Sequence, residues 1–229
     1  MHAAFAACEA LVRRHDPDRF FAALFAPEGK RPFLFALYAL YYELAHAAAA
    51  AREPMLADIR LAWWRETVEG ARAGHPRDHD VARALAETFR AADLPAELFE
   101  RMIAARSFDA GAEPFADLKA LEDHADATSG ILMRLAARVL DTEADDLARQ
   151  AGIAYALAGR SGDKFRLVQS EIAPLAKAHY LAARAMAAPR EALAAFLPAA
   201  LVPLYLKHRD PPLWRKQIAL LSSAVRGQI

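Results

Sequence analysis

The sequence predicts an all-α protein, and two observations support this fold class. Alanine, leucine, glutamate and arginine dominate nearly every segment, while runs of valine, isoleucine and threonine are missing, so helix propensity is high and strand propensity is low throughout. Apolar residues also recur at intervals of three and four, as at Phe35, Tyr38 and Tyr42. This spacing places them on one face of a helix, where they can pack against a neighbouring helix.

Helix-breaking residues divide the chain into eight to ten expected helices. Proline and glycine steps interrupt the helical pattern at 16–17, 27–29, 53–54, 74–76, 94–95, 113–114, 159–162, 189 and 210–212. Asp16 followed by Pro17 is typical of a helix start, because the carboxylate can cap the first turn and proline fits its first position. We likewise expect Asp93 to cap a helix after residue 94, and Asp141 or Thr142 to cap the one that runs to residue 160.

The composition indicates one globular domain over residues 1–229 and excludes some functions. A hydrophobic content of 55% in 229 residues suits one substantial core. The 29 basic residues balance 29 acidic ones without a basic run, so we expect no nucleic-acid partner. A single cysteine, Cys8, can form no internal disulfide, which favours a reducing compartment and a cytoplasmic protein.

The sequence predicts no membrane-spanning helix. At the N-terminus Glu9, Arg13 and Arg14 follow the small apolar residues instead of preceding them, which is the wrong order for a secretory signal. No stretch reaches the roughly 18 uncharged apolar residues that a membrane-spanning helix needs. Peripheral contact with the inner membrane stays open.

Several segments, read in order, resemble squalene/phytoene synthases. Near the start they are Asp-Pro-Asp-Arg-Phe at residues 16–20, Phe-Ala-Leu-Tyr-Ala at 35–39 and Ile-Arg-Leu-Ala-Trp-Trp-Arg-Glu at 59–66. Further along they are Ala-Arg-Ser-Phe-Asp at 105–109, Ala-Thr-Ser-Gly-Ile-Leu at 127–132, Gly-Ile-Ala-Tyr-Ala-Leu at 152–157 and Leu-Trp-Arg-Lys-Gln at 213–217. Single motifs of this kind are weak, but their shared order covers almost the whole chain. The resemblance implies the isoprenoid synthase fold, a set of helices around a cavity for prenyl diphosphates.

The resemblance also implies what an active member needs. Such enzymes hold Mg²⁺ between the diphosphates and two Asp-x-x-x-Asp motifs on facing helices, because residues four apart share one helix face. In this chain the positions of the first aspartate pair are occupied by Ala45 and Ala49, and the nearby acid is Glu43. Where the second motif belongs, Asp163 is the acid available and Lys164 stands beside it. We therefore expect no cofactor and no metal, with Mg²⁺ required only if the chain is an enzyme after all.

The Glu-Leu-Ala step at residues 43–45 resembles a branch of the family that lacks these motifs and includes a mitochondrial assembly factor of respiratory complex I. This likeness implies a non-catalytic binding or assembly factor, with a respiratory complex subunit as its partner. Two alternatives stay open. One is a prenyltransferase that joins two prenyl diphosphates, and the other is a protein that binds an isoprenoid or another lipid without turnover.

Two sets of candidate site residues follow from these alternatives. Residual catalysis would depend on Glu43, Asp109 and Asp163. Ligand binding without metal would use aromatic, acidic and basic side chains around the former cavity, with the cations holding an anion. The candidates for it are Tyr38, Tyr42, Glu43, His46, Arg60, Trp64, Arg106, Arg160, Lys164 and Arg166.

Two further acidic patterns predict no metal site. Glu43 and His46 are three apart, as in one half of a di-iron site, but no second Glu-x-x-His occurs in the sequence. Asp123 and Asp126 are also three apart, and we expect them to form a hydrated acidic face.

Overall fold

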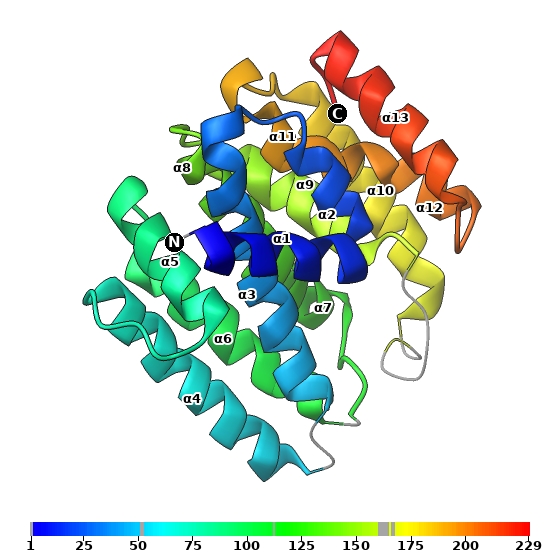
Figure 1. The fold of residues 1–229 in the computed structure, drawn as a ribbon. Coiled ribbons are helices and arrows are strands. Elements are labelled where there is room, and N and C mark those ends of the chain that lie inside the picture. The colour runs from blue at the N-terminus through cyan, green and yellow to red at the C-terminus, as the bar shows by residue number, and fades with distance from the viewer. Residues whose placement is uncertain (1, 51–52, 112, 160–164, 166–167) are drawn as a thin grey trace. The chain divides into compact units, whose positions relative to one another are not determined.

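The computed structural model describes residues 2–50, 53–111, 113–159, 165 and 168–229 (Figure 1). Within these ranges the secondary structure is helical and contains no β-strand, so the predicted all-α class is confirmed. The chain folds into two compact units, Met1–Gly111 and Ala112–Ile229. A single domain over residues 1–229 stays a prediction.

The first unit contains six α-helices and one short 3-10 helix in its described residues (blue to green in Figure 1). They are α1 (His2–His15), α2 (Pro17–Ala23), η1 (Glu28–Lys30), α3 (Arg31–Ala49), α4 (Pro54–Arg72), α5 (Asp80–Ala91) and α6 (Ala96–Ala110). The helix α3 is the centre of this unit, since α1, α2, α4, α5 and α6 all pack against it. Residues 34–40 are buried without exception, which explains why this part of the helix is apolar on every side.

The helix starts of the first unit test two predicted caps. Asp16 begins α2 as predicted: its side chain accepts a hydrogen bond from the backbone N–H of Arg19 at 3.1 Å, and Pro17 takes the first helical position. The prediction for Asp93 is wrong, because α6 begins at Ala96 with Pro95 as its N-cap and without a side-chain cap. Asp93 lies too far before the first turn to reach its free N–H groups.

The second unit has more helices than its proline and glycine residues predict. They are α7 (Leu118–Ala125), the π-helical turn η2 (Asp126–Gly130), α8 (Ile131–Val139), α9 (Asp145–Leu157), α10 (Gln169–Ala185), η4 (Arg190–Ala192), α11 (Leu193–Phe196), η5 (Leu197–Leu201), α12 (Val202–Lys207) and α13 (Leu213–Arg226). The described residues of the chain thus form thirteen α-helices where eight to ten were expected. One reason is that Pro198 and Pro203 divide the segment before α13 into short pieces.

The break between α8 and α9 corrects another predicted cap. Asp141 has a positive φ of 57°, and the backbone N–H of Thr142 donates to the carbonyl of Ala137 at 3.0 Å. This left-handed turn closes α8 from its C-terminal side, as in a Schellman motif. Asp141 and Thr142 therefore end one helix instead of capping the next, which begins at Asp145.

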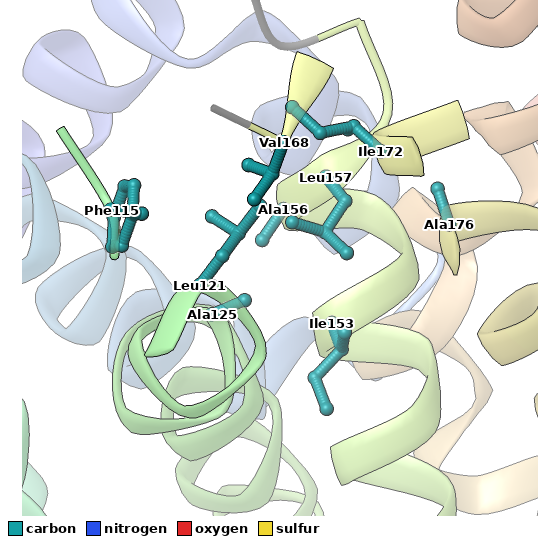
Figure 2. Packing of buried hydrophobic residues seen from close by; sticks show 9 residues of the cluster. All are labelled: Phe115, Leu121, Ala125, Ile153, Ala156, Leu157, Val168, Ile172 and Ala176. Carbon is teal, nitrogen blue, oxygen red and sulfur yellow. The ribbon is translucent and has the colours of Figure 1, made fainter. Parts of the chain in front are cut away.

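The apolar core of the second unit forms around α9 (Figure 2). Leu121 and Ala125 of α7 point toward Ile153 and Leu157 of α9 in this view. Phe115, Ala156, Val168, Ile172 and Ala176 complete the buried cluster. Small alanines at several of these positions allow the helix backbones to approach closely.

Candidate functional site

The first unit contains a stack of two arginines on one tyrosine, which we name the Tyr41 cluster: Asp16, Arg19, Tyr41, Arg106 and Asp109. The guanidinium carbon of Arg19 lies 4.8 Å from the centre of the Tyr41 ring, and that of Arg106 lies 4.4 Å from it. Each arginine is also paired with an acid three residues away in sequence. Arg19 Nη1 lies 2.6 Å from Asp16 Oδ2, and Arg106 Nη1 lies 2.8 Å from Asp109 Oδ2.

Arg106 is an enclosed cation of the Tyr41 cluster, as Arg19 is. Its side chain is only 6% exposed, and its Nε and Nη2 atoms have no hydrogen-bond partner within the described part of the chain. Burial lowers the pKa of Arg106, but the neighbouring Tyr41 and Asp109 more than offset this effect and raise the pKa above its ordinary value. Arg106 therefore stays charged, and its Nε and Nη2 are buried donors without a partner among the described residues.

Glu43 lies in a different place, although it is only two residues from Tyr41 on α3. Two residues turn a helix by about 200°, so the two side chains leave α3 on nearly opposite faces. Glu43 lines a pocket of about 410 Å³ together with residues of α1, of α5 and of the turn before α5. Those residues are Ala7, Cys8, Leu11, Asp78, His79, Asp80, Val81 and Arg83. The acids Glu43 and Asp109 thus lie in separate surroundings.

The positions of the first aspartate pair of an active synthase carry no acid here. Ala45 is half-buried and Ala49 is exposed near the end of α3, and Glu43 is the one acidic residue of this helix. Within the described ranges, no group of three or more His, Cys, Asp or Glu side chains is arranged to hold a metal ion. Asp163, the acid expected for the second motif, lies outside the described residues.

The aromatic candidates on α3 divide between core and surface. Tyr38 is buried, and its hydroxyl has no hydrogen-bond partner among the residues that the structure describes. Burial raises the pKa of this phenol, so it stays neutral. Tyr42 is half-buried and its ring stacks on two histidines, with centroid distances of 4.3 Å to His15 and 5.7 Å to His46. These two tyrosines therefore do not share one surface.

The remaining candidates show no common location. Arg60 is exposed on α4, whereas Trp64 is buried and its ring meets the edge of His79 at 5.2 Å. The neighbouring Trp63 is 39% exposed, because adjacent residues point about 100° apart on a helix. The other predicted cations are not among the described residues; they are Arg160, Lys164 and Arg166.

Sequence reasoning missed a charged network around η2 in the second unit. Asp126 lies 2.7 Å from Arg134 and 3.7 Å from Arg149, while Glu122 lies 2.7 Å from Arg149. His179 of α10 approaches Glu122 at 3.8 Å, and its Nδ1 lies 2.6 Å from Oε1 of Gln150. The expected hydrated face is therefore wrong for Asp126, whose side chain is 14% exposed, because two arginines enclose it.

The π-helical turn explains why the spacing did not reveal this network. A π-helix adds one residue to the turn, so it shifts the residues that follow, such as Arg134, relative to Asp126 and away from the 3.6-residue period. Asp123, by contrast, is 58% exposed and pairs with Lys119, as an acidic surface position should.

Two solved structures with a similar fold are described as a dehydrosqualene synthase and a squalene synthase. A dehydrosqualene synthase crystallised with a ligand superimposes with a TM-score of 0.78 at 16% identity, covering 98% of this chain and 96% of that one. The squalene synthase HpnC from Alicyclobacillus acidocaldarius gives a TM-score of 0.69 at 18% identity, covering 98% and 94%. At these identities the likeness concerns the fold, and it confirms the predicted isoprenoid synthase architecture.

Among characterised proteins, the chain is similar to assembly factor 6 of NADH dehydrogenase (ubiquinone) complex I. The human and bovine proteins are each 26% identical over 153 residues, which make up 66% of this chain. The match spans 46% of those relatives, so less than half of their length is represented here. The family model for squalene/phytoene synthase matches residues 12–161. Since this match extends over well over half of the sequence and the fold agrees with it, the chain belongs to the squalene/phytoene synthase family.

Proposed function

We propose that this chain is a non-catalytic member of its family that acts as a binding or assembly factor for respiratory complex I. The observation that carries the proposal is the separation of Glu43 from Asp109. Glu43 lines the pocket beside α1 and α5, while Asp109 is paired with Arg106 on the other side of α3. Hard divalent cations need several oxygen ligands together, so this arrangement favours binding over Mg²⁺-dependent prenyl transfer.

The partner is suggested by the relatives. Mammalian complex I assembly factor 6 shares 26% identity with this chain over 153 residues. We therefore infer a protein partner among the respiratory complex subunits, located at the inner membrane. Only 46% of the human protein is matched, so the partner carries over as a hypothesis about the shared region.

A gene deletion in the native host tests the assembly role directly. Membranes without the protein should oxidise NADH more slowly than wild-type membranes and contain less assembled complex I on native gels. Succinate oxidation serves as the control, because it bypasses complex I and should not change. Restoring the gene should restore NADH oxidation. Unchanged amounts of assembled complex I after the deletion would refute the assembly role.

A second candidate function is the binding of a prenyl diphosphate or a lipid phosphate without turnover. The specific observation that favours it is the enclosed Arg106, whose Nε and Nη2 have no hydrogen-bond partner within the described residues. Buried guanidinium groups bind phosphate oxygens strongly when they can use two donors at once. Calorimetry with farnesyl diphosphate, with and without Mg²⁺, tests it. Micromolar binding without Mg²⁺ that is weaker in the Arg106→Met variant would support this function. The absence of any binding heat, with and without Mg²⁺, would refute it.

A further inference from the structure

The last helix of the second unit exposes an apolar stripe to solvent. Trp214, Ile218, Leu221 and Val225 of α13 are 56%, 58%, 54% and 80% exposed. Spacings of four, three and four residues place them on one face of the helix. The opposite face already has a partner, since Leu220 is fully buried and α13 packs against η5. The stripe is thus a second apolar surface of α13, beyond the one that the fold needs.

The charged side chains of α13 are all positive. The helix α13 contains no aspartate or glutamate, and Arg215 and Arg226 follow one flank of the stripe. With Arg184 of α10, these two arginines line a groove of about 600 Å³. No Asp or Glu side chain lines this groove. Within the part of the chain that the structure describes, none of the three arginines is in an ion pair with a carboxylate side chain.

The helix α4 of the first unit offers an informative contrast. It also exposes apolar residues four apart, with Met55 at 72% and Ile59 at 60%. Charges of both signs surround them, because Asp58, Arg60 and Glu66 are exposed on the same helix. An anionic surface would be repelled by two of these three side chains. Exposed apolar area alone therefore does not single out α13, whereas apolar area with charge of one sign does.

We propose that α13 docks in the interface of an anionic phospholipid membrane. The stripe of Trp214, Ile218, Leu221 and Val225 enters the boundary between headgroups and acyl chains, as the apolar face of an interfacial helix does. Arg184, Arg215 and Arg226 lie beside this boundary and bind lipid phosphates in the groove. Trp214 is well suited to this depth, because an indole ring is apolar but carries one N–H donor.

This docking mode is peripheral and does not depend on a role in complex I assembly. Among the described helices, none combines the length and the apolar character needed to cross a bilayer. Because purified protein and lipid vesicles suffice for the test, its result is separate from that of the gene deletion.

Vesicle flotation of the purified full chain tests the proposal. The probes are vesicles of phosphatidylcholine alone and of phosphatidylcholine mixed with phosphatidylglycerol. The protein should float with the mixed vesicles and remain in solution with the neutral ones. Ile218→Ser combined with Leu221→Ser should weaken this binding by about tenfold or more, because apolar burial supplies much of the affinity. Arg215→Gln should weaken it about fivefold, and binding should decrease as salt screens the lipid charge.

Matched variants elsewhere on the chain provide the controls. Met55→Ser combined with Ile59→Ser removes similarly exposed apolar groups from α4 and should leave flotation unchanged. Arg90→Gln removes one exposed positive charge from α5 and should also have no effect. Equal flotation with both kinds of vesicle, or equal loss in the α4 and α13 variants, would overturn the proposal. The proposal would also be overturned if the wild-type protein is a dimer that does not bind vesicles and the variant with Ile218→Ser and Leu221→Ser is a monomer. The stripe would then bind a second copy of the chain.

Discussion

Gly130 and Gly152 meet backbone to backbone where η2 packs against α9. A Cβ atom added to Gly152 would lie 2.4 Å from the α-carbon of Gly130, much closer than a Cβ atom approaches other heavy atoms in proteins. The two glycines belong to the segments 127–132 and 152–157, which carried the family resemblance. Their shared role within the second unit is close packing, because both neighbouring backbones are fixed within helices.

Gly152→Ala should therefore destabilise the protein. The methyl group can be accommodated only if η2 and α9 separate, and overpacking of this kind costs about 1 to 3 kcal/mol. Urea denaturation followed by circular dichroism measures the change. Gly29→Ala is the control, because nothing lies within 4 Å of its added Cβ. Equal midpoints for the two variants would contradict this account of the glycine contact.

Asp109→Ala should destabilise the protein because it leaves the Arg106 charge buried without its carboxylate. Removing one partner of a buried ion pair costs about 3 to 5 kcal/mol, and we expect about 2 to 3 kcal/mol here because Asp109 is 23% exposed. Chemical denaturation measures this change in the free energy of unfolding. Glu9→Ala breaks the pair with Arg13, whose side chains are 43% and 67% exposed respectively, and should cost less than about 1 kcal/mol. If Asp109→Ala loses no more stability than Glu9→Ala, the pair of Arg106 and Asp109 is solvated.

Stability should decrease in mild acid through His179. Burial lowers the pKa of His179, and the nearby Glu122 offsets only part of this effect. The unfolded chain, with a histidine pKa of about 6.5, then takes up the proton more readily than the folded one. The neutral ring of His179 contributes its full stabilisation at pH values above the pKa of the unfolded chain. This contribution is lost as the pH decreases toward the lower pKa of His179 in the folded protein. His179→Gln should shrink the difference in urea midpoint between about pH 7 and about pH 5.

The exposed His75 provides the comparison for this pH effect. His75→Gln should keep the wild-type difference between the two midpoints. If both variants respond to pH as the wild type does, His179 does not control acid stability.

Cys8 should be unreactive in the folded protein. It is 1% exposed, and burial, assisted by Asp80 and Glu43, raises the pKa of its thiol to about 12. The thiolate is the reactive form, so almost none is present near neutral pH. A disulfide reagent such as DTNB should label the protein only after denaturation. Labelling of the native protein at the rate of a free thiol would show that Cys8 is accessible.

Local signals in the sequence were enough for the helical class and for some helix starts. Pro17 and Asp16 define α2 because both the proline ring and the cap act within one turn. The adjacent Trp63 and Trp64 point about 100° apart on α4, which allows one side chain to be exposed and the other buried. Asp141 could not be predicted in this way, since its left-handed conformation depends on how α8 ends.

The Tyr41 cluster illustrates what the sequence could and could not reveal about the site. The spacing of three residues between Asp16 and Arg19, and between Arg106 and Asp109, is typical of ion pairs on a helix. The stack itself joins α2, α3 and α6, and no local spacing predicts which side chains meet across helices. The enclosure of Asp126 could not be predicted for the same reason, because Arg149 reaches it from α9.

The most direct test of the central claim is turnover. The purified chain is incubated with geranylgeranyl or farnesyl diphosphate and Mg²⁺, beside a dehydrosqualene synthase as positive control, and released pyrophosphate and hydrocarbon product are measured. We predict that pyrophosphate stays at the level of the protein-free reaction and that no product of two joined prenyl chains forms. Mg²⁺-dependent release of pyrophosphate with such a product would contradict the account.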